Sequence, residues 1–331
     1  MNILVTGGTG YIGSHVVVEL LEQRHNVVIL DNLSCSQYEV LEKIQAITGI
    51  KPTFYNNDLT NISSLEQVFN KLNFDLVIHL AGLKAVAESI KQPIDYYNNN
   101  IVGTLNLLKV MESHSITNFI FSSSASVYGN QKNGKCSENM STGIGITNPY
   151  SKTKYIIEEI LKDLSASNSK FSAISLRYFN PIGNHQSGLL GENINGVSNN
   201  LMSSIIKVAL GELPELEIFG NDYKTPDGTC LRDFIHVTDL AKGHLASIKR
   251  LCPGFKIYNL GTGHPTSILE VVHAFEKISG LSLPYRFAPR RPGDLPIIFA
   301  DPEKAERELH WHADLTVEDA IKDVVTYLRH K

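Results

Sequence analysis

The 331-residue chain has few cysteines, no long apolar run and no excess of basic residues. Its four cysteines, Cys35, Cys136, Cys230 and Cys252, are widely spaced and form no CxxC pair. We therefore expect reduced thiols rather than a disulfide framework or a zinc site. No uninterrupted apolar stretch approaches the roughly 18 residues that a membrane-spanning helix requires. These absences predict a cytoplasmic protein with no bound metal.

Basic charge is also scarce. The 30 Lys and Arg residues against 34 Asp and Glu give a formal net charge of −4, and the basic residues form no run. This balance argues against binding to nucleic acid or to an acidic membrane surface. The first residues, Met1–Gly7, lead directly into a strand-like segment without a basic or long apolar region, so we expect no secretory signal.

Short apolar runs alternate with helix-like segments in the first half of the chain. The runs are continuously apolar, which favours strands buried on both faces of a parallel sheet. Repeated strand–helix units predict a doubly wound parallel α/β sheet of the Rossmann type. The expected strands are Ile3–Val5, Val27–Leu30, Thr53–Tyr55, Leu76–Leu80, Phe119–Phe121 and Ala173–Leu176, and the expected helices include Ile12–Glu22, Cys35–Ile47, Ser63–Leu72 and Ile101–Ser113.

The regular alternation ends near residue 177, so we predict one domain over 1–176 and a smaller, less regular α/β domain over 177–331. Some segments, within 233–261, are expected to pack back on the first domain, with Ile257–Leu260 returning to its sheet. The second part is expected to hold a Gly- and Asn-rich loop, two helices and a Pro- and Arg-rich loop, namely Asn180–Asn200, Leu201–Leu210, Val271–Ile278 and Pro289–Asp294.

A glycine-rich turn, Thr6–Gly13, follows the first strand and opens the first helix. Its Gly7, Gly10 and Gly13 suit a tight turn, a close approach of pyrophosphate to the main chain, and close packing of helix against strand. The helix N-terminus offers unpaired N–H groups to the phosphates. The turn, with Tyr11 and Ile12 inside it, therefore predicts a dinucleotide site.

Asp31 lies at the end of the second strand, 18 residues after Gly13. An acid there can accept hydrogen bonds from ribose hydroxyls and repel a 2′-phosphate, so NAD is favoured over NADP. The alternative is that Asp31 caps the N-terminus of the next helix. It is disfavoured because Asp31 lies too far before the expected start of that helix at Cys35. Asp58 follows the third strand and fits either an adenine contact or a loop cap. Four further residues join this candidate cofactor set: Asn32, Ser36, Asp58 and Leu59.

Tyr150 and Lys154 are four residues apart on a helix expected to start near Pro149, so they share one face. Lowering a tyrosine pKa from about 10 to near 7 needs roughly 4 kcal/mol, which the lysine and a positive nicotinamide ring could supply together. Such a tyrosinate can remove a hydroxyl proton while hydride leaves the same carbon. Ser124, just beyond the fifth strand, lies at the same sheet edge and can share that proton. A Ser-rich turn with a surface Tyr/Lys pair is the alternative.

These residues give the chain a resemblance to the extended short-chain dehydrogenase/reductases and, within them, to the UDP-glucose 4-epimerases. The resemblance covers nearly the whole chain. It rests on ten ordered segments: Thr6–His15, Ala81–Val86, Tyr96–Thr104, Ser122–Gly129, Tyr150–Lys154, Arg177–Pro181, Asn199–Met202, Gly220–Tyr223, Arg232–Val237 and Arg290–Asp294.

The resemblance implies an NAD-binding first domain and a UDP-sugar-binding second domain. It adds to the cofactor set Leu80, Ala81, Gly82, Lys84, Asn99 and Phe179, alongside Ser124, Tyr150 and Lys154. Around a UDP-hexose it implies Lys84, Ser124, Tyr150, Asn180, Asn200, Leu201, Ile218, Phe219, Arg232, Arg291, Asp294 and Ile298. Forked guanidinium donors make Arg232 and Arg291 reasonable diphosphate ligands.

The implied reaction is inversion of C4 by transient oxidation. Tyr150 would take the C4 hydroxyl proton while NAD takes the hydride, the 4-keto sugar would turn, and the hydride would return. A 4,6-dehydratase is disfavoured because Ala125 and Ser126 stand where those enzymes have an Asp-Glu pair. Uronic-acid epimerases and decarboxylases, and a non-catalytic dinucleotide sensor, stay open as alternatives.

The resemblance also implies a homodimer through the helices Tyr97–Ser113 and Tyr150–Ser165, paired as a four-helix bundle. We expect Leu105, Leu108, Ile156 and Ile160 on their outer faces, although these residues could equally cover the chain's own sheet. Ile298 is expected to line the sugar pocket. Being intermediate in size and β-branched, it predicts a preference for UDP-glucose and UDP-galactose over UDP-N-acetyl sugars.

Overall fold

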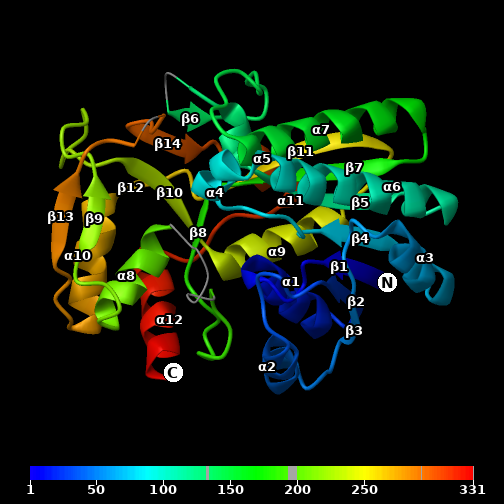
Figure 1. Cartoon of the computed structure of the whole chain (residues 1–331), viewed down its shortest axis with the longest axis horizontal. Coiled ribbons are helices and arrows are strands. Elements are labelled where there is room, and N and C mark those ends of the chain that lie inside the picture. Colours follow the sequence, from blue (N-terminus) through cyan, green and yellow to red (C-terminus); the bar gives the residue numbers. More distant parts are fainter. Residues whose placement is uncertain (132–133, 193–199, 292, 331) are drawn as a thin grey trace.

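The computed structural model describes residues 1–131, 134–192, 200–291 and 293–330. The parts of the two predicted loops at 193–199 and 292 lie outside the described residues. The dominant feature is a parallel sheet of seven strands in the order β11-β7-β5-β4-β1-β2-β3 (Figure 1). These strands are β1 (Asn2–Thr6), β2 (Asn26–Asp31), β3 (Thr53–Asn56), β4 (Leu76–His79), β5 (Asn118–Ser124), β7 (Ser172–Tyr178) and β11 (Gly254–Leu260). The predicted fold class is confirmed.

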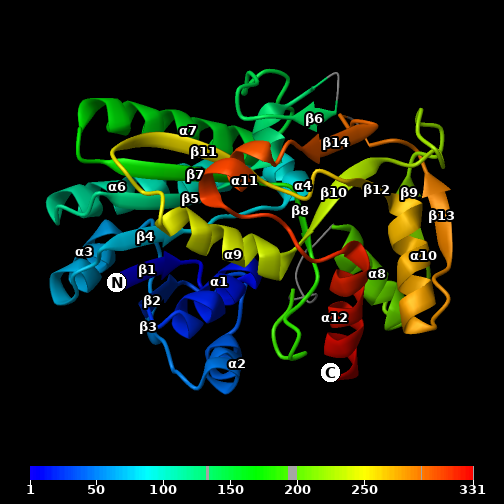
Figure 2. The ribbon, with the colours of Figure 1, turned by 180° about the vertical axis from the view of Figure 1, so that it is seen from behind.

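Helices cover both faces of this sheet, as its continuously apolar strands require. One face packs against α1 (Tyr11–Glu22), α2 (Glu39–Thr48), α9 (Val237–Ile248) and α11 (Glu303–Leu309). The other packs against α3 (Ile62–Lys71), α6 (Gly103–Ser113) and α7 (Pro149–Ser167). Figures 1 and 2 show these two layers from opposite sides. Short helices α4 (Val86–Lys91), α5 (Pro93–Tyr96), the π-helix η1 (Tyr97–Val102) and the 3-10 helix η2 (Ala125–Tyr128) lie along the connections.

The chain reverses its winding direction beside β1. It runs outward from β1 to β2 and β3 and then returns to β4 on the other side of β1. The connections that leave the carboxyl ends of β1 and β4 therefore run in opposite directions. This creates the crevice where ligands bind in open α/β sheets. The glycine-rich turn and the residues after β4 both lie at this edge.

The second region forms a smaller unit beside the large sheet, on the left in Figure 1. A mixed sheet has the order β12-β10-β14-β6, with β8 also paired to β10, and a second sheet pairs β9 with β13. Its separate hydrophobic core is enclosed by helices α8, α10 and α12. The elements are β6 (Lys135–Cys136), β8 (Asn180–Ile182), α8 (Leu201–Ala209), β9 (Leu216–Phe219), β10 (Leu231–His236), β12 (Pro265–Ser267), α10 (Ile268–Ser279), β13 (Tyr285–Ala288), β14 (Ile297–Ala300) and α12 (Val317–Arg329).

The chain returns to the first sheet after β10. Helix α9 packs against α1, and β11 pairs in parallel with β7 from Gly254↔Ser172 to Leu260↔Tyr178. The predicted return of Ile257–Leu260 is thus confirmed. The division of the chain into domains at 176/177 stays a prediction.

The predicted start of the second helix is wrong, because α2 begins at Glu39 rather than Cys35. Asp31 accepts a hydrogen bond from Leu33 N, and Asn32 accepts one from Ser34 N. Leu33 also has φ +57°. These local turns compete with helix formation, so the chain enters α2 four residues later than predicted.

Candidate active site

The glycine-rich turn has room for glycine alone at two positions. At Gly7, where φ is +72°, a Cβ would lie 2.6 Å from Ala81 N, and at Gly13 it would lie 2.0 Å from Gly7 O. At Gly10 a Cβ would meet a single atom, Gly7 O at 3.2 Å, which is a tight contact. Gly10 is the N-cap of α1 and has no side-chain cap, so the helix presents free N–H groups there. The turn fits the pyrophosphate of a dinucleotide.

Asp31 connects the end of β2 to this turn. Its carboxylate accepts hydrogen bonds from Thr9 N at 3.2 Å and Leu33 N at 2.9 Å. Ser36 lies beside it, with its Oγ 2.6 Å from Thr9 Oγ1 and 3.5 Å from Asp31 Oδ1. Because α2 starts eight residues later, Asp31 does not cap a helix. Its position suits the acid that binds ribose hydroxyls.

Asp58 stands at the neighbouring strand end and bonds to Asn32. Its carboxylate accepts hydrogen bonds from Asn32 Nδ2 at 2.8 Å and from Thr60 N and Oγ1. Burial alone would raise the pKa of Asp58, but these donors outweigh it and lower the pKa. Leu59 packs under Gly103 of α6. Asp58 is therefore an ionised loop cap whose place at the sheet edge also suits a cofactor contact.

The residues after β4 close the other side of the turn. Leu80 N donates to Thr6 O at 3.1 Å, and Ala81 N lies 3.4 Å from Thr6 Oγ1. Asn100, which the sequence analysis missed, holds the next residues: it accepts from Leu83 N and donates to Leu83 O and Thr153 Oγ1. Its predicted neighbour Asn99 donates to Asn100 Oδ1. Asn100 belongs to the π-helix η1, a type of helix often found at functional sites.

Tyr150, Lys154 and Ser124 meet at the carboxyl edge of β5. Helix α7 starts at Pro149, as predicted, and Asn148 caps it by accepting from Ser151 N at 2.9 Å. Ser124 lies close enough to Tyr150 to lower the pKa of its hydroxyl. Lys154 Nζ donates to Ser122 O at 2.6 Å and lies 6.0 Å from the centre of the Tyr150 ring. The structure thus brings the three predicted residues together.

The electrostatics of this cluster differ from the sequence-based expectation. Burial raises the pKa of Tyr150, and the Ser124 hydrogen bond and the Lys84 charge oppose this only in part. Burial also lowers the pKa of Lys154 to about 8, against the opposing effect of Glu158. The positive charge that assists Tyr150 here comes from Lys84, whereas the Lys154 ammonium is directed to a main-chain carbonyl.

Lys84 forms an ion pair that the sequence analysis did not foresee. Its Nζ lies 3.0 Å from Glu192 Oε1. Glu192 also accepts from Asn200 Nδ2 and Ser203 Oγ. Burial would raise the pKa of Glu192, but Lys84 and these donors lower it. Glu192 thus joins a predicted cofactor residue to a predicted substrate residue; it stands in a loop without a motif, so no pattern identified it.

The predicted sugar-side residues gather where the second region meets the large sheet. Phe179 follows β7 and packs in a small apolar cluster with Tyr128, Met140 and Ile298. Asn180 opens β8 and pairs with Phe234 of β10. Ile298 of β14 pairs with Arg232 of β10. This apolar cluster also contains Ala125, the residue that follows Ser124.

Arg232 and Asp294, expected to bind separate parts of the ligand, lie together as an ion pair with Nη2 3.4 Å from Oδ1. Arg232 Nη1 also donates to Leu231 O and Leu295 O. The Arg291 guanidinium lies 3.8 Å from the centre of the Phe219 ring, a stacked arrangement that suits a planar base or a phosphate. The Ile218 side chain is only 1% exposed and belongs to the core. The predicted contact of Ile218 with the substrate can therefore come only from its main chain.

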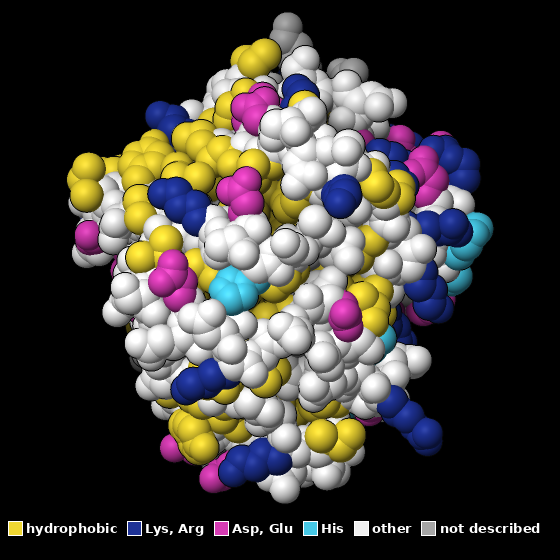
Figure 3. All heavy atoms as spheres, turned by 90° about the vertical axis from the view of Figure 1, so that its right-hand side faces the viewer, with side chains coloured by type: hydrophobic (Ala, Val, Ile, Leu, Met, Phe, Trp, Pro, Cys, Tyr) yellow, Lys and Arg dark blue, Asp and Glu magenta, His cyan; other side chains and the backbone are white. Residues whose placement is uncertain are grey.

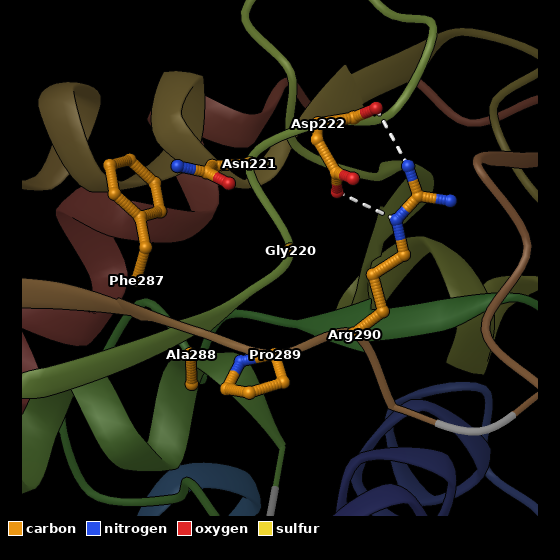
Figure 4. Close-up of a pocket in the computed structure, with 7 residues that line it drawn as sticks. All are labelled: Gly220, Asn221, Asp222, Phe287, Ala288, Pro289 and Arg290. Atoms are coloured by element: carbon orange, nitrogen blue, oxygen red, sulfur yellow. Dashed lines mark hydrogen bonds and ion pairs between the residues drawn. The ribbon is translucent and has the colours of Figure 1, made fainter.

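An open pocket lies beside the Phe219–Arg291 pair, lined by residues of the segments after β9 and around the end of β13 (Figure 4). Figure 4 shows Arg290 directed toward Asp222, and its Nε lies 2.7 Å from Asp222 Oδ1. Arg290 also stacks on Tyr223 at 4.1 Å. Since Arg290 is occupied by these partners, Arg291 is the arginine of this loop that faces Phe219.

The described part of the chain contains no helix long and apolar enough to cross a membrane. It also contains no cluster of three or more His, Cys, Asp or Glu that could hold a metal ion. The four cysteines are free thiols, and Cys136 and Cys230 are buried.

The doubly wound sheet, with a glycine turn at its switch point and an acid after β2, defines a Rossmann-type dinucleotide-binding protein. Within this class, the chain belongs to the NAD dependent epimerase/dehydratase family, which it matches over residues 3–261.

Individual relatives match nearly the full length. A UDP-glucose 4-epimerase of Bacillus subtilis (strain 168) is 50% identical over 325 residues, which cover 98% of this chain and 95% of the relative. The crystal structure of UDP-glucose 4-epimerase from Bifidobacterium longum in complex with NAD+ and UDP has a TM-score of 0.96 and 47% identity, covering 100% and 99% of the two chains. The enzyme from Stenotrophomonas maltophila, solved with NAD and formylated UDP-arabinopyranose, has a TM-score of 0.96 at 43% identity, covering 100% and 98%.

Proposed function

We propose that this protein interconverts UDP-glucose and UDP-galactose by inverting C4 of the hexose with bound NAD. The observation that carries the proposal is that Tyr150, Ser124 and Lys84 come together at the carboxyl edge of the sheet, the edge that also carries a glycine turn shaped for a dinucleotide. The near full-length similarity to UDP-glucose 4-epimerases supports the choice of substrate.

The chain's own residues fit each part of this reaction. Tyr150 accepts the proton of the C4 hydroxyl, and Ser124 hydrogen-bonds the same oxygen and orients it. The Lys84 charge favours the tyrosinate. NAD, when bound, supplies the hydride acceptor and donor. The glycine turn and Asp31 hold the dinucleotide; the turn is tight because Gly13 lies so close to Gly7 O that no Cβ would fit.

The nucleotide half of the substrate is assigned to the second region. Arg232 and Arg291 hold the diphosphate, Phe219 stacks on the uracil, and Asp294 accepts from the uridine ribose. Asn180, Asn200, Leu201 and the main chain of Ile218 complete this set. If UDP is bound firmly and the sugar makes few contacts, the 4-keto intermediate can turn and present its other face to the cofactor.

A 4,6-dehydratase is less consistent with the site. That chemistry needs an acid and a base directly after the catalytic hydroxyl residue, whereas Ala125 and Ser126 stand there in the 3-10 helix η2. Ser126 N donates to Ser124 Oγ at 3.2 Å, so this turn serves to orient Ser124. A dinucleotide sensor without activity does not require the Tyr150–Ser124 contact.

The test is to incubate the purified protein with UDP-galactose without added NAD and to measure UDP-glucose by chromatography. We expect conversion toward equilibrium, and NAD released on denaturation. Release of water to give a 4-keto-6-deoxy sugar would favour the dehydratase. Bound NAD without any product would favour the sensor.

We also propose a homodimer formed through α6 and α7, in the cytoplasm. Figure 3, which looks onto the right-hand side of Figure 1, shows hydrophobic side chains gathered at its upper left. The elements that lead into α6, namely α4, α5 and η1, carry the exposed apolar residues Val86, Ile90, Ile94 and Val102. The prediction that Leu108 lies on the outer face is wrong, because this side chain is 7% exposed and packs in the chain's own core. A monomer mass by light scattering at micromolar concentration would refute the dimer.

A further inference from the structure

A buried carboxylate lies directly behind the proposed catalytic cluster. Glu158 is on α7, one helical turn after Lys154 and two turns after Tyr150, and it is only 2% exposed. Among the described residues, its hydrogen-bond partners belong neither to the glycine turn nor to the residues assigned to the sugar. A charged side chain in such a place needs partners to offset its desolvation.

The Glu158 carboxylate binds two strands at once. Ser123 Oγ of β5 and Ser175 Oγ of β7 donate to its Oε1 at 2.6 and 2.8 Å. Arg177 of β7 donates from Nε to Oε1 at 3.0 Å and from Nη2 to Oε2 at 2.6 Å. The Arg177 guanidinium also lies 4.7 Å from the centre of the Tyr128 ring. Four hydrogen-bond donors therefore link one turn of α7 to β5 and β7.

The same face of α7 meets three consecutive residues of β5. Lys154 donates to the carbonyl of Ser122 and Glu158 accepts from Ser123, while Tyr150 lies close enough to Ser124 for that hydroxyl to lower its pKa. Side chains at i, i+4 and i+8 share one face of a helix. A slip of the Glu158 contact would therefore move Tyr150 away from Ser124 as well.

Glu158 is also the anion nearest to the Lys154 ammonium along the helix. The titratable or charged groups around Lys154 are Tyr150 and Glu158 on α7, His79 on β4 and, behind Glu158, Arg177 on β7. Burial and the Lys154 charge lower the pKa of His79 to about 3, so this ring is neutral at working pH. Glu158 is then the group that opposes the loss of the Lys154 proton.

Building on the proposed function, we propose that Glu158 is a positioning residue of the epimerase. It fixes the register of α7 on β5 and β7, so that Tyr150 stays beside Ser124 and Lys154 stays on the carbonyl of Ser122. The competing explanation is a purely structural ion pair with Arg177, since buried pairs are poor evidence for any particular role. Only the positioning role predicts an altered pH profile of turnover.

Three variants separate these explanations. Replacing Glu158 alone would leave Arg177 buried without its partner and could unfold the protein. The Glu158→Gln/Arg177→Gln double variant removes both charges; glutamine keeps the shape of Glu158 but is shorter than Arg177. Glu158→Asp keeps both charges and shortens the reach by one methylene. Glu159→Gln is the control, because Glu159 is the next residue of α7 and is exposed.

Each variant is assayed for kcat and KM across pH, for bound NAD per chain, for UDP affinity by calorimetry and for its thermal midpoint. We expect the double variant to retain NAD and UDP binding and to lose kcat about tenfold or more through misplacement of Tyr150. The alkaline limb of its kcat profile should move down by about half a pH unit or more, since Lys154 loses its anion. Glu158→Asp should lose kcat with the alkaline limb in place.

A double variant with wild-type kcat and wild-type alkaline limb would overturn the proposal. A double variant whose rate falls only in proportion to its loss of bound NAD would also overturn it. So would a Glu158→Asp variant whose thermal midpoint falls while its kcat is unchanged. If wild type and Glu159→Gln both fail to convert UDP-galactose, the proposed function fails instead. The two failures are therefore distinguishable.

Discussion

Replacing Tyr150 by phenylalanine removes one hydroxyl from the centre of the proposed site. The ring remains, so the packing of α7 on the sheet is preserved. Two protein groups bear on the protonation of this hydroxyl, Ser124 and the charge of Lys84. The variant therefore tests whether this oxygen transfers a proton or only contributes a hydrogen bond.

The two possibilities differ in magnitude. Loss of one neutral hydrogen bond costs about 0.5–1.5 kcal/mol, which corresponds to a factor of about ten at most. Loss of a positioned acid–base group lowers turnover about a hundredfold to ten-thousandfold, or about 3–5 kcal/mol of transition-state free energy. We therefore expect Tyr150→Phe to lose at least about a hundredfold in kcat.

The assay is conversion of UDP-galactose with bound NAD quantified in each preparation. Tyr155→Phe is the matched control, because it removes the same atom from the same helix. Its ring packs near Gly143, where a Cβ would lie 2.7 Å from Tyr155 Cζ, and not at the cluster. If Tyr150→Phe keeps its NAD and stays within tenfold of Tyr155→Phe, Tyr150 is not the base.

Three other perturbations test the cofactor site, the sugar pocket and the buried histidines. Asp31→Ala should loosen the preference for NAD over NADP, and NADP found in denatured wild-type protein would contradict the role of Asp31. Ile298→Gly should raise kcat/KM for UDP-N-acetylglucosamine relative to UDP-glucose, because wild type should disfavour the larger sugar by about 1–3 kcal/mol; wild type that already prefers it would refute the pocket argument. Burial lowers the pKa of His15 and His79 to about 3 and of His244 to about 4. Below about pH 6.5 the unfolded chain takes up these protons while the folded chain does not. The free energy of unfolding should therefore decrease as the pH is lowered, by about 1.4 kcal/mol per pH unit for each histidine. His15→Asn should reduce that slope, measured by urea denaturation, by one proton.

The sequence predicted the parts of the molecule whose signals are local. Six strands of the large sheet appeared as apolar runs, and the glycine turn and the Tyr150–Lys154 spacing each lie within a few consecutive residues. The pairing of β6 with β14 was out of reach, since β6 has only two residues, Lys135 and Cys136. Such a strand has no pattern of its own and exists because Phe299 and Ala300 lie beside it.

The side chains that the sequence analysis missed share one property: their partners are distant in the chain. Glu192 is 108 residues from Lys84, and Arg290 is 68 residues from Asp222. The outer-face assignment of Leu108 failed for a related reason. A helix that covers a sheet and a helix that covers a partner show the same apolar periodicity, and only the three-dimensional packing distinguishes the two faces.

Glu158 shows most clearly where local patterns end. In the sequence it stands beside Glu159 in a helix with a polar face, so both glutamates look like solvated residues. The strand below contributes Ser175 and Arg177, two polar side chains at positions where a continuously apolar strand would have apolar ones. These exceptions in β7 and the glutamate in α7 explain each other once the helix lies on the sheet, because each provides the partner that the other needs in order to be buried. A polar residue that breaks an otherwise apolar strand at the carboxyl edge of such a sheet is therefore a reason to search the covering helix for its partner, and here that search leads to the turn next to Lys154.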